Sequence, residues 1–192
     1  FPTRRSSDLY SGSEPIRLDI LERFAEQFAP CGFTPNSFFA SYGLAEATLF
    51  VAGGRRGHGI PALRLDAQAL AANRAEPGQG AAIMSCGTSQ PDHAVLIADP
   101  HTLSELPDNH VGELWASGPS IAHGYWRNPE ASAKTFVQHA GRTWLRSGDL
   151  GFICEGEVYI TGRLKDLLIV RGHNLYPQDI EQTDRKSTRL NS

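Results

Sequence analysis

The chain has 192 residues, 18 of them basic and 21 acidic, and a formal net charge of −3 at pH 7. This length suffices for one sizeable domain, and the acidic balance disfavours nucleic-acid binding. No apolar run approaches the roughly 18 residues that a membrane-spanning helix needs. Cys31, Cys86 and Cys154 are odd in number and widely spaced. We therefore expect no disulfide framework and no zinc site, and a cytoplasmic location is the default.

The two ends of the chain are polar, basic and without hydrophobic periodicity. Residues 1–9, FPTRRSSDL, and residues 184–192, DRKSTRLNS, both match translations of sequencing-adapter DNA. We expect both to be non-native tails, with native basic tails as the alternative. Without them, residues 10–183 carry 13 basic and 19 acidic side chains, a net charge of −6. On this interpretation the chain is a piece cut from a longer protein.

The first elements are predicted from hydrophobic spacing. Apolar residues over 16–29 recur at helical spacing, with Pro15 at the start and Pro30 beyond the end, which predicts an amphipathic helix. Residues 34–35 suggest a short turn, and the aromatic-rich residues 37–42 suggest a strand. The sequence YGLAEAT follows this strand at residues 42–48. Its glycine allows close backbone approach to a ligand, and its glutamate can hold Mg²⁺, although an exposed loop glutamate is the alternative.

The middle of the chain has a weak and then a clearer pattern. Residues 53–80 give little helix or strand signal and are interpreted as an insertion with partial structure. Strands are predicted over 82–86 and 94–98, with a polar loop between 99 and 110. Residues 111–118, VGELWASG, alternate apolar and polar side chains, which predicts a half-buried strand. Asn128 and Pro129 are typical of a helix N-terminus, and this helix is expected to run to about Gln138.

Towards the C-terminus, residues 144–153 predict a strand, a turn at Ser147-Gly148-Asp149 and a second strand. Residues 157–161 predict another strand, paired through a Glu155-Gly156 turn. Residues 162–181, GRLKDLLIVRGHNLYPQDIE, contain an apolar strand, a turn at Arg171-Gly172 and a helix that begins at Pro177. Carboxylates in the first turn of that helix would suit its dipole.

Five motifs occur in a fixed order: GSEP at 12–15, YGLAEAT at 42–48, GELWASG with GYW at 112–126, SGD at 147–149 and GRLKD…RGHNLYPQDIE at 162–181. Each alone is weak, but this order resembles the adenylate-forming superfamily of acyl-CoA synthetases, fatty acyl-AMP ligases, peptide-synthetase adenylation domains and luciferases. The resemblance implies an α/β fold of mixed α+β type. Residues 10–164 would form the C-terminal part of the large AMP-binding domain with its β-rich subdomain, and residues 165–183 the hinge and the start of the small C-terminal domain.

The resemblance also implies ATP and Mg²⁺ as cofactors and gives each site residue a role. Gly12, Ser13 and Glu14 would lie along the adenine, Tyr42 with Gly43 would stack on its other side, Asp149 would accept hydrogen bonds from the ribose hydroxyls, Arg163 would contact the ribose, Glu46 would bind Mg²⁺ and Lys165 would be the hinge pivot. Structural alternatives exist for three of these residues. Asp149 can satisfy local amides, Arg163 and Asp166 can form a surface pair, and Tyr42 can be an ordinary core aromatic.

Within the superfamily, three segments are similar to fatty acyl-AMP ligases: GLAEATLFVAGG at 43–54, Ser85-Cys86-Gly87 and RGHNLYPQDIE at 171–181. Ala45 stands where many members have a phosphate-contacting threonine, which puts that contact in doubt. Residues 51–84 fall where this branch carries an insertion. The implied activity converts a fatty acid to acyl-AMP and pyrophosphate, for transfer to an acyl carrier protein of a polyketide or peptide synthetase. A long-chain acyl-CoA synthetase and a non-catalytic nucleotide-binding relic are the alternatives.

Two further elements of the superfamily do not occur in this sequence. The phosphate-binding loop is expected before Tyr10, and the adenylation lysine after Thr183. We therefore expect no catalytic residue in this chain and no acyl-adenylate formation by the chain alone. The insertion leads to a further hypothesis, because an insertion packed against the hinge side would disfavour the small-domain orientation that thioester formation requires.

Overall fold

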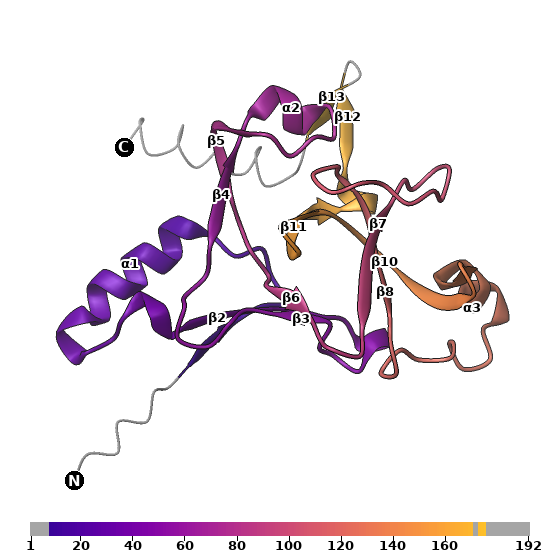
Figure 1. The fold of residues 1–192 in the computed structure, drawn as a ribbon, viewed down its shortest axis with the longest axis horizontal. Helices are drawn as coiled ribbons and strands as arrows, with labels where there is room; N and C mark the ends of the chain where they lie inside the picture. The colour runs from indigo at the N-terminus through magenta and orange to yellow at the C-terminus, as the bar shows by residue number, and fades with distance from the viewer. Residues whose placement is uncertain (1–7, 171–172, 176–192) are drawn as a thin grey trace, which may run out of the picture.

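Two β-sheets and two β-ribbons make up most of the structure (Figure 1). The computed structural model describes residues 8–170 and 173–175. The first sheet has the order β1-β2-β3-β6, with β1 parallel to β2 and the other pairs antiparallel. Its strands are β1 (Leu9–Ser11), β2 (Phe38–Tyr42), β3 (Ala52–Gly53) and β6 (Thr88–Ser89).

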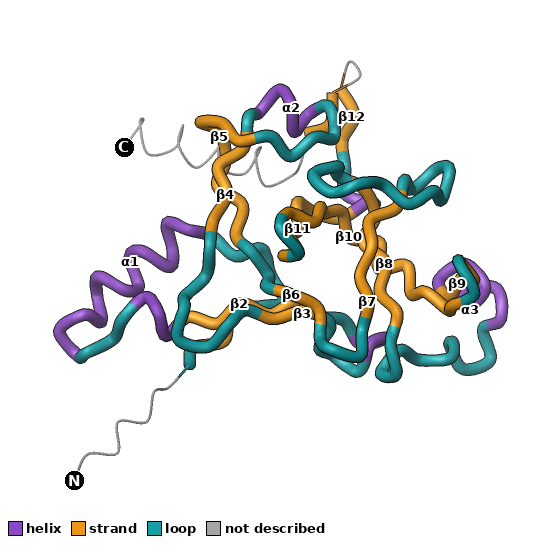
Figure 2. Tube along the Cα trace, viewed as in Figure 1, coloured by secondary structure: helices purple, strands orange, loops and turns teal. Residues whose placement is uncertain are grey.

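The second sheet is antiparallel and has the order β11-β10-β8-β7, with β9 paired to β10 (Figure 2). Its strands are β7 (Ala94–Ala98), β8 (Gly112–Ser117), β9 (Phe136–His139), β10 (Arg142–Cys154) and β11 (Glu157–Arg163). The ribbons pair β4 (Ala62–Leu65) with β5 (Pro77–Met84), and β12 (Leu168–Val170) with β13 (His173–Leu175). The mixture of parallel and antiparallel pairs and helices agrees with the predicted α/β class.

Helices are few and short in the described residues. They are α1 (Leu18–Phe28), α2 (Ala67–Ala71) and α3 (Pro129–Thr135), with the 3₁₀ turns η1 (Ala29–Cys31), η2 (Pro35–Ser37), η3 (Ala45–Ala47) and η4 (Leu164–Asp166). None of the helices in the described part of the chain is long and apolar enough to cross a membrane. α1 confirms the predicted amphipathic helix. Its Phe24 ring lies 5.1 Å from the Phe33 ring and 5.8 Å from the Phe38 ring of β2, which attaches the helix to the first sheet.

The fold begins slightly earlier than the sequence predicts. β1 starts at Leu9, which pairs with Phe38, and the Asp8 carboxylate lies 3.4 Å from Arg56 Nε. Asp8 and Leu9 both belong to residues 1–9, which the sequence predicts to be a non-native tail. The strand forms through its parallel partner, a long-range contact that the local composition does not reveal.

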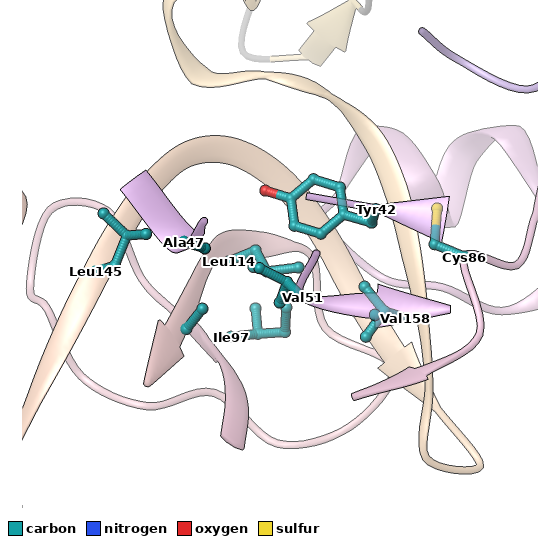
Figure 3. Packing of buried hydrophobic residues seen from close by; sticks show 10 residues of the cluster. Tyr42, Ala47, Val51, Cys86, Ile97, Leu114, Leu145 and Val158 are labelled. Carbon is teal, nitrogen blue, oxygen red and sulfur yellow. The ribbon is translucent and has the colours of Figure 1, made fainter. Parts of the chain in front are cut away.

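The main hydrophobic core lies between the two sheets. Figure 3 shows its buried side chains, which come from β2, η3, β3 and the residue before it, the segment after β5, and strands β7, β8, β10 and β11: Tyr42, Ala47, Val51, Ala52, Cys86, Ile97, Leu114, Ala116, Leu145 and Val158. Backbone hydrogen bonds join the sheets at one edge, where Cys86 N donates to Val158 O and Val158 N donates to Gly87 O, at 2.7 and 2.8 Å. The two sheets are therefore fixed to each other near this edge.

β8 corrects the prediction of a half-buried strand, because every residue from Gly112 to Ser117 is buried. Glu113 is only 2% exposed. Its carboxylate accepts hydrogen bonds from Arg146 Nη2 and Nε at 2.7 and 2.9 Å, from Trp115 Nε1 at 3.1 Å and from the Gly148 amide at 3.2 Å. These hydrogen bonds stabilise the Glu113 carboxylate in the interior, where burial of an unpaired charge is strongly unfavourable.

β10 corrects a second prediction, since it is one strand and not two strands with a turn. Its pairing with β8 shifts register between Arg146 and Leu150, and Gly148 there has φ of +72°. Ser147 Oγ donates to Leu114 O at 2.7 Å and accepts from Asp149 N at 3.0 Å, which keeps the irregular segment attached to the sheet. Such a bulge redirects a side chain without ending the strand.

α3 begins as predicted, because Asn128 Oδ1 accepts a hydrogen bond from Ala131 N at 3.1 Å. The helix ends at Thr135, short of the predicted Gln138. Residues 136–139 instead form β9, which pairs with β10 and places Phe136 opposite Leu145. Tertiary pairing therefore overrides the helical pattern in this segment.

The predicted insertion, residues 51–84, is more ordered than its composition suggests. β4 and β5 form a ribbon, and Asp66 caps α2 by accepting hydrogen bonds from the amides of Gln68 and Ala69 at 3.0 and 2.8 Å. β5 begins at Pro77 and ends at Met84, so the strand predicted over 82–86 starts earlier and ends before Ser85. Figure 1 shows the ribbon leading away from the first sheet to α2.

A second hydrophobic cluster attaches this insertion to the second sheet. It contains Leu65, Leu70 and Ala75 from the insertion together with Val111, Leu150, Phe152 and Tyr159. Leu164 and Leu167, at and beside η4, pack against the same cluster. α2 also lies beside β13 (Figure 1). The insertion thus packs against the predicted hinge region. The helix predicted from Pro177 lies outside the described residues.

Candidate functional site

A cavity of about 450 Å³ lies where the first sheet, β5, β10, β11 and η4 meet. Six of the nine residues predicted from sequence line it: Ser13, Glu14, Tyr42, Gly43, Asp149 and Arg163. Gly12, Glu46 and Lys165 do not line it. The six predicted residues come from four separate segments of the chain.

Gly12 and Gly43 have packing reasons to be glycine. A Cβ on Gly12 would lie 2.7 Å from both the carbonyl oxygen and Oγ of Ser41. A Cβ on Gly43 would overlap the Leu49 carbonyl oxygen, because the chain folds back sharply and Val51 N donates to Tyr42 O at 2.9 Å. The sequence predicts that Gly43 allows close approach of a ligand. The structure adds that the turn itself excludes a side chain.

The central feature of the cavity is a hydrogen bond between two strands. Tyr42 Oη on β2 donates to Asp149 Oδ2 on β10, at 2.7 Å. Arg163 Nε on β11 lies 3.5 Å from Asp149 Oδ1. The Arg163 side chain is 60% exposed and the Asp149 side chain 16% exposed, so the pair lies at the mouth of the cavity. The family resemblance predicts both Tyr42 and Arg163 as site residues.

Burial dominates the electrostatics of this pair. It raises the pKa of Asp149 above its ordinary value, and the buried Glu113 carboxylate acts in the same direction. The Tyr42 hydrogen bond and the charges of Arg163 and Lys165 lower that pKa. Burial also raises the pKa of Tyr42, so its hydroxyl stays protonated and acts as the donor.

Glu46, the predicted Mg²⁺ ligand, lies outside the cavity in η3. Its Oε1 accepts a hydrogen bond from Tyr125 Oη at 2.6 Å, and its carbonyl oxygen accepts one from Ala122 N at 2.7 Å. Ser120 Oγ donates to Ala47 O at 2.8 Å, and Thr48 Oγ1 donates to Ser120 O at 2.7 Å. The loop after β8 therefore holds the η3 turn, and with it Glu46, in place.

The described residues contain no cluster of three or more His, Cys, Asp or Glu side chains that would hold a metal ion by itself. Glu46 offers a partly exposed carboxylate with one oxygen free of the Tyr125 bond. Mg²⁺ commonly uses one or two protein carboxylates together with substrate phosphates and waters. Glu46 fits Mg²⁺ only as such a partner to a phosphate-bound ion.

Lys165 lies in η4, two residues after Arg163, and is exposed. Its positive charge contributes to the electrostatics of Asp149. Asp166, its neighbour, lines the cavity. The predicted hinge is therefore next to the candidate site.

Sequence reasoning missed the apolar part of the cavity. Ala82, Ile83 and Met84 of β5, Cys86 after it, and Ile160 of β11 line the cavity beside the polar group. Cys86 is 8% exposed, and burial raises its pKa to about 11, so it behaves as an apolar side chain and not as a nucleophile. The only sequence signal for this apolar wall was the Ser85-Cys86-Gly87 segment. That segment resembles fatty acyl-AMP ligases, but it was not predicted to belong to the site.

Comparison with known proteins identifies similar chains. The family described as AMP-binding enzyme matches residues 4–126. The chain is 44% identical to the long-chain-fatty-acid–AMP ligase FadD26 of Mycobacterium marinum, over 94% of this chain and 33% of that protein. It is 42% identical to the medium-chain-fatty-acid–[acyl-carrier-protein] ligase JamA of Moorena producens, over 92% of this chain and 32% of that protein.

Among solved structures, the chain is similar to a fatty acyl-adenylate ligase from L. pneumophila in complex with acyl adenylate and pyrophosphate. The TM-score is 0.79 and the sequence identity 36%, over 83% of this chain and 29% of that chain. The chain thus spans about a third of the length of the relatives that it matches.

Proposed function

Because this chain belongs to the family of AMP-binding enzymes, we propose that the full-length protein containing it joins a medium- or long-chain fatty acid to AMP and releases pyrophosphate. The observation that carries the proposal is the cavity in which Asp149 meets Tyr42 and Arg163. Its volume of about 450 Å³ lies within the range of small-molecule sites.

The proposed reaction is an in-line displacement at the α-phosphorus of ATP. A carboxylate oxygen of the fatty acid forms a bond to this phosphorus, and the bond to the oxygen that bridges to the β-phosphorus breaks, so that pyrophosphate leaves. Positioning of the nucleotide accounts for much of the catalysis of such a step. In this chain the Asp149 carboxylate would accept the ribose hydroxyls, and the Tyr42 ring would contact the adenine.

Glu46 is the residue in this chain that would hold Mg²⁺ together with phosphate oxygens. The ion, when bound, neutralises negative charge on the phosphates. The contact from Tyr125 Oη fixes one of the two Glu46 carboxylate oxygens, which leaves the other for the ion.

For the second step we propose transfer of the acyl group to an acyl carrier protein in the cytoplasm. One of the similar proteins is named as a ligase of medium-chain fatty acids and acyl carrier protein. The rival acceptor is coenzyme A, which would give a long-chain acyl-CoA.

Fatty-acid-dependent exchange of labelled pyrophosphate into ATP tests the first step with the full-length protein. We expect exchange with medium- or long-chain acids and none from the 192-residue chain alone, whose sequence holds neither the phosphate loop nor the lysine that the family resemblance implies. No exchange by the folded full-length protein with any acid would favour the non-catalytic alternative. Adding purified carrier protein or coenzyme A then identifies the acceptor, since acyl-CoA as the main product would overturn the carrier-protein proposal.

A further inference from the structure

The cavity contains one contact whose role the proposed function does not explain, the hydrogen bond from Tyr42 Oη to Asp149 Oδ2. The two residues are 107 positions apart in sequence and belong to different sheets. The proposed function gives the ring of Tyr42 to the adenine and the carboxylate of Asp149 to the ribose, but it gives the hydroxyl no task. A ring contact with adenine requires only an aromatic side chain, and phenylalanine would supply it.

The direction of this hydrogen bond is fixed by chemistry. An ionised carboxylate has only acceptor sites, and the buried Tyr42 hydroxyl keeps its proton. The hydroxyl therefore donates to Oδ2. At 2.7 Å the bond has the short length typical of a donor on a charged acceptor.

The contact restrains how the carboxylate is oriented. Asp149 follows Gly148 in the irregular part of β10, where pairing with β8 is interrupted. On its other side Asp149 pairs with Arg163 of β11, and its amide donates to the Ser147 side chain. Oδ1 lies 3.5 Å from Arg163, a longer and more solvent-exposed contact than the one that Tyr42 makes to Oδ2. Tyr42, held by the core between the sheets, is thus the most rigid partner of this carboxylate.

Each carboxylate oxygen has two acceptor positions, so the Tyr42 bond leaves room for ligand hydroxyls on Asp149. We propose that the Tyr42 hydroxyl is a positioning group that orients Asp149 towards a nucleotide diol and so sets the preference of the enzyme for ribose over a sugar without hydroxyls. This inference rests on the proposed function. It adds that the Tyr42 hydroxyl affects the choice of sugar by orienting Asp149, while the Tyr42 ring contacts the adenine.

The test compares ATP with 2′,3′-dideoxy-ATP in the full-length enzyme and its Tyr42→Phe variant. We expect the variant to lose about tenfold or more of its kcat/KM for ATP but to change little with the dideoxy nucleotide, because a hydrogen bond to a charged group contributes about that factor. The KM for the fatty acid should stay unchanged. A general loss of folding or of adenine contact would instead lower kcat/KM for both nucleotides to a similar extent.

Tyr159→Phe is the matched control. Tyr159 is 4% exposed, and its hydroxyl also donates to a carboxylate, Glu157 Oε2 at 3.3 Å, but it does not line the cavity. We expect its ratio of ATP to dideoxy-ATP activity to match that of the wild type. Melting temperatures of both variants show whether each is folded.

Two outcomes overturn the inference in distinguishable ways. If the wild type forms acyl-adenylate and Tyr42→Phe keeps the wild-type ratio between the two nucleotides, the hydroxyl does not position Asp149 for the sugar. If the wild type forms no acyl-adenylate from either nucleotide, the proposed function itself is wrong, and this inference falls with it.

Discussion

Deletion of residues 54–80 from the full-length enzyme would show whether the insertion determines the product. The deleted segment contains β4, α2 and the first part of β5, while Ala82, Ile83 and Met84, which line the cavity, remain. We expect adenylation to stay nearly intact and acyl-CoA formation to rise. The reason is that the buried face of this segment packs against the same cluster as Leu164 and Leu167 of the predicted hinge region.

The structure gives the magnitude of this effect. Leu65 is 2% exposed and Leu70 is 8% exposed. Full burial of a leucine stabilises by about 1.5–3 kcal/mol, so the two side chains together contribute roughly 3–6 kcal/mol. About 2.7 kcal/mol changes the ratio of two conformations a hundredfold. A hundredfold change therefore requires that roughly half to nine tenths of this burial energy depends on the orientation of the small domain.

The assay measures acyl-hydroxamate, as a record of adenylate, and acyl-CoA on the same preparation. Leu70→Ala should also raise acyl-CoA formation, but by less than the deletion does. Leu96→Ala is the matched control, because Leu96 is 6% exposed in a separate cluster with Trp115 and Trp144. Adenylate retained with no gain in acyl-CoA would refute the reasoning, and so would an equal gain from Leu96→Ala.

Three further results are expected. Asp149→Ala should weaken ATP binding by roughly 1–3 kcal/mol in calorimetry, with Asp149→Glu only partly tolerated, and wild-type affinity in Asp149→Ala would remove the ribose assignment. Burial raises the pKa of Asp149, and only the ionised form accepts both hydroxyls. As the pH is lowered, ATP affinity should therefore begin to fall at a higher pH than it would with an aspartate of ordinary pKa. Iodoacetamide at pH 8 should label the exposed Cys31 well before the buried Cys86, whose pKa is raised to about 11, and equal labelling by peptide mass spectrometry would contradict the burial. Glu113→Ala should lower the free energy of unfolding by about 3–5 kcal/mol in urea titration, because it leaves the partly buried Arg146 without its partner; a loss below about 1 kcal/mol would show that the charge network is not stabilising.

Local patterns predicted those elements whose determinants lie within a few residues. β7 occupies residues 94–98 as expected, the Asn128 cap forms, and the short connection at Glu155-Gly156 joins β10 to β11. Capping, turn formation and hydrophobic periodicity act over one or two turns of chain, so sequence is enough to reveal them. The order of the motifs likewise indicated the family, which the comparisons confirm.

Longer-range features were decided only by the tertiary structure. The end of α3, the continuity of β10 and the burial of Glu113 all depend on neighbouring strands that the local sequence does not identify. The insertion also depends on distant contacts. Its local sequence pattern is weak, and Leu65 and Leu70 pack it against residues of the second sheet.

The candidate site shows both contributions. The sequence by itself determined which residue types the site contains, since Ser13, Glu14, Tyr42, Gly43, Asp149 and Arg163 were named from their motifs and all line the cavity. Only the tertiary structure decided how they are used. It paired the Tyr42 hydroxyl with Asp149, placed Glu46 beside Tyr125 outside the cavity, and added an apolar wall from β5. The physical reason is that a motif records a residue's chemistry and local backbone, whereas its partner is set by the packing of two sheets, which brings together residues 107 positions apart.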